Sequence, residues 1–288
     1  MAGAWKWLIG AILVLLVAVV GLDRWQASQG EASLFRLAWP GPEAPASPAP
    51  GHQRRPGAAP PPVAPARGGP RVAVIVDDLG ARRDVFERLR EVRRPLTIAV
   101  LPELPLSAWI AREARHAGLE VLVDLPMEPY RYPELDPGPG ALLMGMSGGE
   151  LERQLRRHLE ALPGAVGVTN HMGSRMTEDR GRMRAVLSPL APRRLFFVDA
   201  VASNLSVAYD EARRLGLKAG RRQVIVDHGG GEAGDREQWD EVGRFARRRG
   251  EVIVIAHGHP LTVQLLREYI PRWESDGMRL VPISALVH

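Results

Sequence analysis

Acidic and histidine side chains collect where apolar, β-branched segments of this sequence end. Each of six such segments is followed by residues that could bind a metal ion or move a proton: Asp77–Asp78, Asp124 with Glu128, Asn170–His171, Asp199, Asp227–His228, and His257 with His259. One such terminus would mean little, because an isolated Asp at a strand end usually caps the next helix. Six in one chain indicate a shared site, since the carboxyl ends of parallel strands converge on one face of a βα fold.

The two adjacent carboxylates of Asp77 and Asp78 could take two different catalytic roles. One carboxylate can bind a divalent metal ion while the other takes a proton from a metal-bound water. A His from the last strands could then protonate a leaving amine. Together these groups predict metal-assisted hydrolysis of an amide or ester. The alternative is structural, with the pair capping the helix predicted near Arg82.

The sequence positions these residues by alternating strand and helix patterns from Arg71 onward. The predicted strands are 72–77, 96–101, 119–125, 166–169, 195–199, 223–227, 252–256 and 280–283. The predicted helices are 82–93, 106–117, 150–162, 178–190, 204–215, 236–249 and 262–275. Strands that are apolar on both faces indicate a parallel sheet covered by helices. We expect an α/β fold: a distorted or incomplete (β/α) barrel of seven to eight parallel strands.

The composition limits which residues can bind a metal ion and which partners the chain can bind. The 288 residues include no Cys, so a metal site must use His, Asp or Glu. The net charge is +5, but residues 71–288 carry only +2 of it. A nearly neutral domain lacks the basic surface that phosphate backbones require, so we expect no nucleic-acid partner.

The first 70 residues differ from the rest of the chain. The unbroken apolar run 7–22 predicts a membrane anchor within residues 1–37, with a cleaved signal peptide as the alternative. Residues 38–70 contain 11 Pro, 8 Ala and 5 Gly, which predicts a disordered, extended tether. We therefore expect a bacterial inner-membrane protein, with residues 38–288 on the periplasmic side.

Seven segments of residues 71–288 carry a family resemblance. They are VAVIVDDLG, VLVDLPMEPYRYP, DPGPGAL, NHMGSRMTED, LFFVDA, RRQVIVDH and VIVIAHGHPLT, in that order. Together they resemble the divergent polysaccharide deacetylase family, a distant branch of the polysaccharide deacetylase superfamily. The resemblance implies a distorted (β/α) barrel and metal-dependent removal of acetyl groups from envelope or extracellular polysaccharide.

The resemblance also implies roles for individual residues. Asp77 matches the catalytic base and His257 the acid, whereas Asp78 matches the first metal ligand. His171 lies in the NHMGS segment and is the expected histidine ligand. Asp124 and Glu128 stand where the superfamily has a His-x-x-x-His metal pair, and we expect them to complete the site. The resemblance implies a divalent metal ion as the cofactor, with zinc as the first choice and another divalent ion as the alternative.

Substrate contacts are assigned to residues near the same strand ends: Tyr130, Arg175, Asp199, Asp227 and His259. Tyr130, in a long loop after the third strand, could stack on a sugar.

One departure from the family pattern leaves a second hypothesis about function open. Relatives usually read Asp-Ser-Arg-Thr after the fifth strand, and here Asp199 is followed by Ala200, Val201 and Ala202. The alternative is a non-catalytic envelope protein whose barrel mouth binds glycan or a partner protein.

Overall fold

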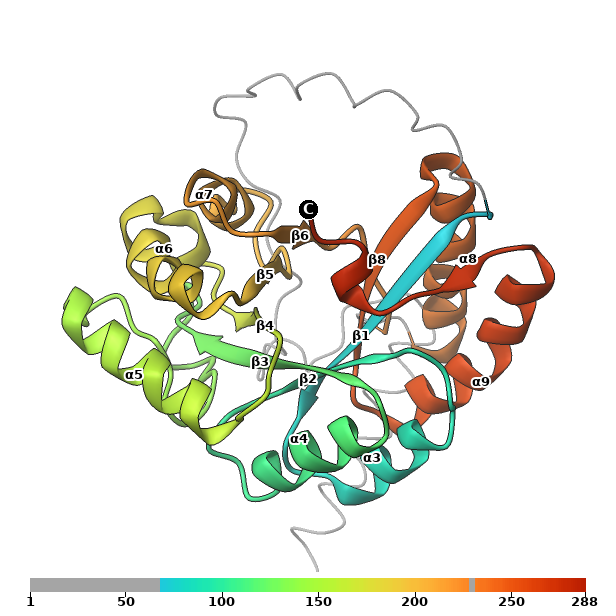
Figure 1. Ribbon diagram of the computed structural model, residues 1–288, viewed down its shortest axis with the longest axis horizontal. Coiled ribbons are helices and arrows are strands. Elements are labelled where there is room, and N and C mark those ends of the chain that lie inside the picture. The colour runs from blue at the N-terminus through green and yellow to red at the C-terminus, as the bar shows by residue number, and fades with distance from the viewer. Residues whose placement is uncertain (1–67, 228–230) are drawn as a thin grey trace, which may run out of the picture. The chain divides into compact units, whose positions relative to one another are not determined.

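The computed structural model describes residues 68–227 and 231–288, which form one curled parallel sheet with helices on its outside (Figure 1). Its strands are β1 (Arg71–Leu79), β2 (Thr97–Val100), β3 (Glu120–Met127), β4 (Gly167–Met172), β5 (Phe196–Asp199), β6 (Ala219–Arg221), β7 (Val224–Ile225), β8 (Glu251–His257) and β9 (Arg279–Leu280). The strand order is β6-β5-β4-β3-β2-β1-β8-β7, with β9 paired to β1, and every pairing is parallel. This arrangement fits the incomplete (β/α) barrel predicted from the sequence.

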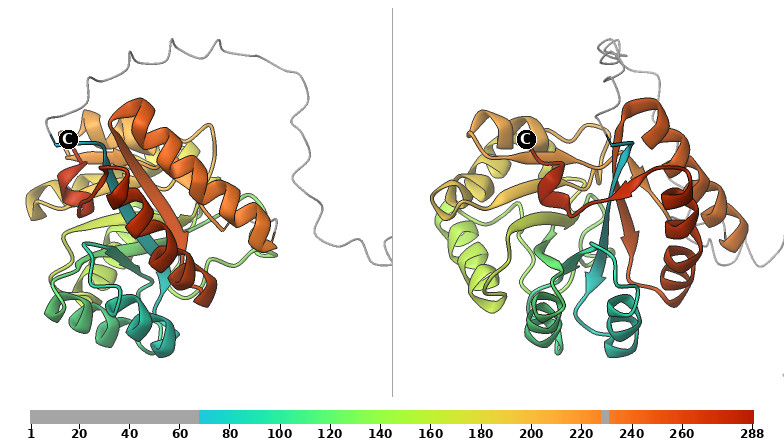
Figure 2. Two further views of the ribbon diagram at one scale, coloured as in Figure 1. Left: turned by 90° about the vertical axis from the view of Figure 1, so that its right-hand side faces the viewer. Right: turned by 45° about the vertical axis from the view of Figure 1, so that its right-hand side comes forward.

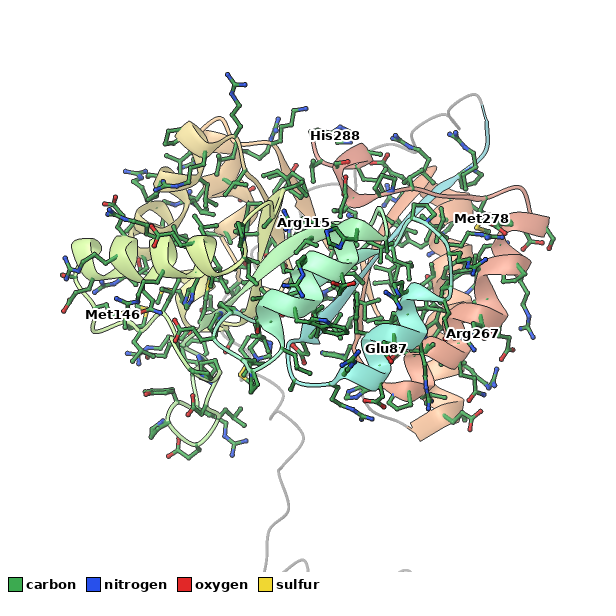
Figure 3. The ribbon with its side chains drawn as sticks, turned by 60° about the horizontal axis from the view of Figure 1, so that its bottom comes forward. Glu87, Arg115, Met146, Arg267, Met278 and His288 are labelled. Carbon is green, nitrogen blue, oxygen red and sulfur yellow. The ribbon has the colours of Figure 1, made fainter. Side chains whose placement is uncertain are left out.

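The connections between strands are helical, as the alternating pattern predicts. The helices are α3 (Arg83–Arg90), α4 (Ser107–His116), α5 (Gly148–Ala161), α6 (Arg180–Leu187), α7 (Ala208–Arg214), α8 (Gly231–Arg249) and α9 (Pro260–Ser275). Ser147 and Glu150 form a capping box that starts α5. Helices α3 and α9, far apart in sequence, pack together, with Glu87 and Arg267 on neighbouring surfaces (Figure 3). Arg267 of α9 also donates to Glu91, which directly follows α3, at 2.7 Å.

Alternation along each strand builds two apolar clusters on the two faces of the sheet. In β1, Val72, Val74 and Val76 pack under the helices, whereas Ala73 and Ile75 point to the inside of the curl. The C-terminal segment runs along the inside of the curl (Figure 2). Its Ile283, Leu286 and Val287 pack against the inner residues of β1 and β8. Both faces of β1 are therefore buried, which explains why its sequence is continuously apolar.

The sheet departs from the predicted strands near its edges. The strand predicted at 223–227 is reduced to β7, and a further short strand that was not predicted, β6, precedes it. The two are the ends of the strand order and do not pair with each other. The last predicted strand, 280–283, is reduced to β9 and gives way to a 3₁₀ turn at Ile283–Ala285. The curl therefore stays open between β6 and β7.

Within residues 68–227 and 231–288, no helix has the length and apolar character needed to span a bilayer. The inner-membrane location predicted from the sequence is therefore not supported, and this finding corrects it. The apolar run 7–22 to which we assigned the anchor lies outside the described residues, as does most of the tether, 38–67.

A buried polar network fixes the long connection between β3 and α5. His158 of α5 is fully buried, and its Nε2 donates to the carbonyl of Gly140 at 2.8 Å. Gln154 donates to Glu103 at 2.9 Å, so that the loop after β2 joins the same network. Burial lowers the pKa of His158, because the charged imidazolium is poorly solvated there.

This network predicts a pH-dependent contribution to stability. Because the pKa of His158 is lower in the folded state, the unfolded state binds the proton more readily, and stability falls as pH drops below about 6.5. His158→Gln removes the titrating group. We expect its deficit in unfolding free energy to be smaller at pH 5 than at pH 8, as measured by urea denaturation at both values. A deficit that grows toward low pH would contradict the assignment.

Candidate metal centre

The end of β1 turns both adjacent carboxylates into the mouth of the curled sheet. The ladder between β1 and β2 is irregular after Val76, and Asp78 has a left-handed backbone with φ of 57°. Asp tolerates this conformation better than most residues. The neighbouring loop of β8 comes close at Gly258, where a Cβ would lie 2.6 Å from Cδ2 of Leu79. Without the left-handed turn, consecutive strand residues would point to opposite faces.

The capping alternative is not what the structure shows. Helix α3 begins after Arg82, which makes no side-chain capping hydrogen bond. Asp77 and Asp78 instead belong to two clusters of potential metal ligands that share Asp78. They are therefore available for chemistry.

The first cluster consists of Asp78, Asp124 and His171. One donor atom from each residue lies within 4.8 Å of the other two. Nδ1 of His171 lies 2.7 Å from Oδ1 of Asp78 and 4.0 Å from Oδ2 of Asp124. The backbone N–H of Asp78 donates to Oδ2 of Asp124 at 3.3 Å, while the buried Oδ1 of Asp124 has no hydrogen-bond partner. The strands β1, β3 and β4 thus bring three of the predicted ligands to one point.

The electrostatics of this cluster favour a cation. Burial raises the pKa of Asp124 to about 7, and the charge of Asp78 adds to the effect. Burial opposes the protonation of His171, but its hydrogen bond with Asp78 and the charges of both carboxylates outweigh this and raise its pKa. Asp124 and His171 therefore bind protons more readily than usual. A divalent ion at this point would supply the positive charge that those protons otherwise provide. Two carboxylates and one imidazole fit zinc or another divalent ion.

The second cluster joins Asp77 and Asp78 to His257, again with donor atoms within 4.8 Å of one another. Asp77 is nearly buried, and its Oδ1 has no partner among the described residues. Burial raises the pKa of Asp77 well above its usual value, and the charges of Asp124, Asp78 and Asp227 raise it further. An aspartate in this environment is a stronger base than one in water.

Asp227 holds the ring of His257. Nδ1 of His257 lies 2.7 Å from Oδ1 of Asp227, and the hydroxyl of Thr262 donates to the other oxygen at 2.6 Å. The hydrogen bond to Asp227 raises the pKa of His257, although burial opposes it. Both oxygens of Asp227 are thus engaged by side chains of the protein, so the structure shows this residue as the partner of His257. The substrate contact predicted for Asp227 stays a prediction.

Glu128 lies apart from both clusters. Its Oε1 accepts from Nη1 of Arg175 at 2.6 Å, and its Oε2 accepts from the backbone N–H of Met144 at 2.8 Å. The structure therefore does not bring Glu128 together with Asp78 and His171, and Arg175 is occupied by this ion pair. The physical reason is that the nearby guanidinium supplies the positive charge that the buried carboxylate needs.

The remaining predicted contacts divide between the rim and the interior. Asp199 is buried and accepts from the N–H of Val201 at 2.8 Å and from Ser206 at 2.9 Å, so it orders its own loop. His259 is exposed, with its ring centroid 6.1 Å from that of His257. The hydroxyl of Tyr130 donates to Glu178 at 2.5 Å, and its side chain is 59% exposed. Tyr130 and His259 thus remain accessible, whereas Asp199 is not.

A cavity of about 450 Å³ opens beside the two clusters. Its polar lining includes Asp77, Asp78, His171, His257 and Arg222, and its apolar lining includes Ile225 and Ile255. Arg222 was not predicted as a site residue, although it lies in the RRQVIVDH segment, because it precedes the strand and not the carboxyl end at which the other site residues were sought.

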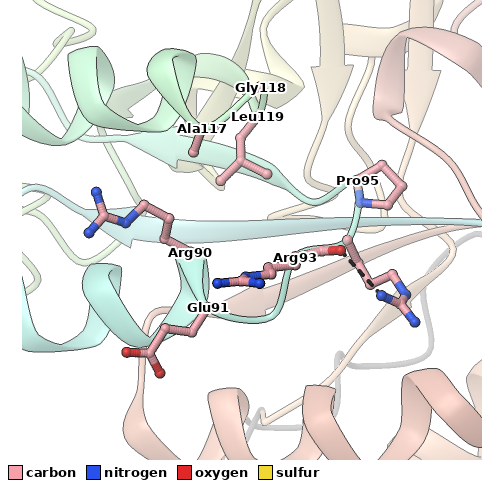
Figure 4. A pocket seen from close by; sticks show the side chains of 8 residues that line it. Arg90, Glu91, Arg93, Pro95, Ala117, Gly118 and Leu119 are labelled. Carbon is pink, nitrogen blue, oxygen red and sulfur yellow. Dashed lines mark hydrogen bonds between the residues drawn. The ribbon is translucent and has the colours of Figure 1, made fainter.

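A second cavity, of about 690 Å³, lies between the loops that follow α3 and α4 (Figure 4). It includes no member of either cluster and is lined by Arg90, Glu91, Arg93, Arg94, Pro95 and the segment 117–119. Arginines at helix C-termini complement the helix dipole, so this surface needs no ligand to explain it.

The match to known proteins covers most of the described chain. The family described as divergent polysaccharide deacetylase matches residues 74–287. The chain belongs to this family. The protein YibQ of Escherichia coli K12, described as uncharacterized, is 34% identical over 218 residues, or 76% of this chain and 67% of YibQ.

Two further proteins are similar to this member of the divergent polysaccharide deacetylase family. An uncharacterized protein of Haemophilus influenzae is 27% identical over 197 residues, or 68% of this chain and 70% of that protein. The crystal structure of the uncharacterized protein ATU2773 from Agrobacterium tumefaciens C58 superposes with a TM-score of 0.73 at 27% identity. It covers 78% of this chain and 92% of that one.

The geometry predicts which carboxylate binds a metal. Asp124→Asn removes a ligand charge, so we expect the affinity for zinc, measured by titration calorimetry, to fall by about a hundredfold or more. The matched control is Glu128→Gln, which removes a buried carboxylate that the structure places outside the cluster. It should keep affinity within a few-fold of wild type. Equal losses in the two variants would restore Glu128 as a ligand.

Proposed function

We propose that residues 71–288 form a metal-dependent hydrolase that removes acetyl groups from a polysaccharide. The observation that carries this proposal is the pair of clusters that share Asp78. One offers a metal-binding set, and the other offers a base and an acid beside it. Membership of the divergent polysaccharide deacetylase family supports the same reaction class.

Asp78, Asp124 and His171 would hold the ion, which when bound supplies a Lewis acid for the acetyl carbonyl and the attacking water. Three protein ligands are typical of a catalytic zinc site, because a position stays open for water or substrate. The engagement of Glu128 by Arg175 is consistent with this count.

Asp77 acts as the base. Its carboxylate lies next to Asp78, so it can accept a proton from a water positioned over the metal-binding cluster. His257 acts as the acid and gives a proton from Nε2 to the leaving amine or alcohol. Asp227 holds Nδ1 of the same ring, which fixes the orientation of the imidazole and favours its protonated form.

Acetylated polysaccharide is the substrate class that fits the surroundings of these groups. The cavity of about 450 Å³ is of a size for one substituted sugar residue. The exposed ring of Tyr130 is held at its hydroxyl by Glu178, and an aromatic ring held in this way can stack on a sugar.

The role of Asp77 separates an enzyme from a glycan-binding protein. Asp77→Asn keeps the shape of the side chain and removes its basicity. We expect kcat for acetate release from acetylated chitooligosaccharide to fall about a hundredfold or more, with zinc content and substrate affinity nearly unchanged. A metal-loaded wild-type protein that releases no acetate from glycan or model ester would favour the non-catalytic alternative.

The contact between Asp227 and His257 predicts the pH dependence of the reaction. His257 must be protonated to act as an acid, so activity falls as pH rises through its pKa. Because Asp227 raises that pKa, Asp227→Asn should move the alkaline limb of the kcat profile to lower pH. Thr262→Val is the matched control, since it keeps the Asp227 carboxylate beside the imidazole. An alkaline limb that does not move in Asp227→Asn would exclude His257 as the acid.

A further inference from the structure

Arg222 is the one arginine or lysine that lines the catalytic cavity in the described part of the chain. It lies between β6 and β7, at the edge where the curled sheet is open. Its Nε donates to the carbonyl of Ala200 at 2.5 Å, and its Nη2 donates to the carbonyl of Val201 at 2.9 Å. This side-on contact fixes the plane of the guanidinium and leaves Nη1 without a protein partner among residues 68–227 and 231–288.

Among residues 68–227 and 231–288, no direct ion pair neutralises the charge of Arg222. No carboxylate oxygen of the described residues lies within 4 Å of its nitrogens. Both oxygens of the nearby Asp199 accept hydrogen bonds from residues 201–209 that follow it. Burial lowers the pKa of Arg222, against the opposing charges of Asp199 and Asp77, and the guanidinium remains charged at any physiological pH. A partly desolvated, fixed cation that binds only neutral carbonyls is suited to recognise an anion by charge-assisted hydrogen bonds.

The position of Arg222 separates it from the metal-binding cluster. Asp78, Asp124 and His171 come from β1, β3 and β4, whereas Arg222 comes from the connection at the open edge. The lining near Arg222 is apolar and includes Ala200, Val201 and Ile225. An anionic group on the substrate would therefore find a single polar contact on this side of the cavity.

We propose that Arg222 binds a carboxylate carried by the sugar chain, so that the substrate class is an acidic glycan. This inference rests on the proposed function, because it assigns the substrate of the same site. The carboxylate could belong to a uronic acid or to a lactyl ether on an amino sugar, which share the chemistry that a guanidinium recognises. A site built to pair a buried polar group discriminates strongly against a ligand that lacks the partner.

The test measures binding to the full-length, zinc-loaded protein, so that it does not depend on turnover. The probes are trigalacturonate and its methyl ester, which differ in charge but hardly in shape. A second pair, the disaccharide of N-acetylglucosamine and N-acetylmuramic acid with and without a methyl-esterified lactyl group, distinguishes the two sources. We expect wild type to bind one of the acids at least about tenfold more tightly than its ester.

The variants locate that preference. Arg222→Gln should bind the acid and its ester with equal affinity, whereas Arg222→Lys, which keeps the charge, should retain part of the preference. The matched control is Arg221→Gln, because Arg221 is exposed on β6, does not line the cavity and carries the same charge. It should keep the full preference.

Two results would overturn the inference. One is a wild-type protein that binds every acid no better than its ester. The other is an Arg222→Gln variant that retains the wild-type preference. Failure of the hydrolase proposal is seen separately, as absent acetate release, and would leave the acid-over-ester preference measurable.

Discussion

The left-handed turn at Asp78 is the constraint on which the site depends. In a regular strand, Asp77 and Asp78 would lie on opposite faces, and one of them would enter the core under the helices. The turn brings both into the mouth, where Asp78 belongs to both ligand clusters. The close approach of Gly258 to Leu79 and the hydrogen bond from its N–H to the carbonyl of Asp77, at 3.0 Å, hold β8 against this turn. His257 therefore reaches Asp77 because of the same backbone geometry.

The apolar core of the fold offsets the electrostatic cost of placing these carboxylates together. Carboxylates held so close together repel one another, and burial increases the cost. The two apolar clusters on either side of the sheet supply the compensating stability, since each fully buried Val or Ile contributes about 1.5–3 kcal/mol. The C-terminal residues Ile283, Leu286 and Val287 complete the inner cluster, so the end of the chain supports a site built by its first strand.

The sequence predicts the parts of the site that local patterns determine. Apolar strands with polar ends indicate the sheet and its functional edge, and the quoted segments single out Asp78, Asp124 and His171, which the structure brings together. Local patterns do not reveal which carboxylate finds a partner in space. Glu128 meets Arg175, which is 47 positions away, and Asp199 turns to its own loop. The sequence does not reveal Arg222 as a cavity residue, because its position in the cavity depends on the opening between β6 and β7. That opening arises only when the sheet curls.

The four aspartates at the mouth differ through their partners and not through their chemistry. Two of them are bound by an imidazole, Asp78 by His171 and Asp227 by His257. The other two, Asp77 and Asp124, are buried with one oxygen unpartnered, and the pKa of each is raised. A raised pKa means that each of these two side chains binds a proton, or another positive charge, more readily than an aspartate in water. For Asp124 this holds although His171 lies 4.0 Å away, because burial and the charge of Asp78 outweigh the imidazole. The two side chains differ in position, since Asp124 lies beside His171 and Asp77 beside His257, and our proposal that one binds a metal ion while the other acts as a base rests on this difference.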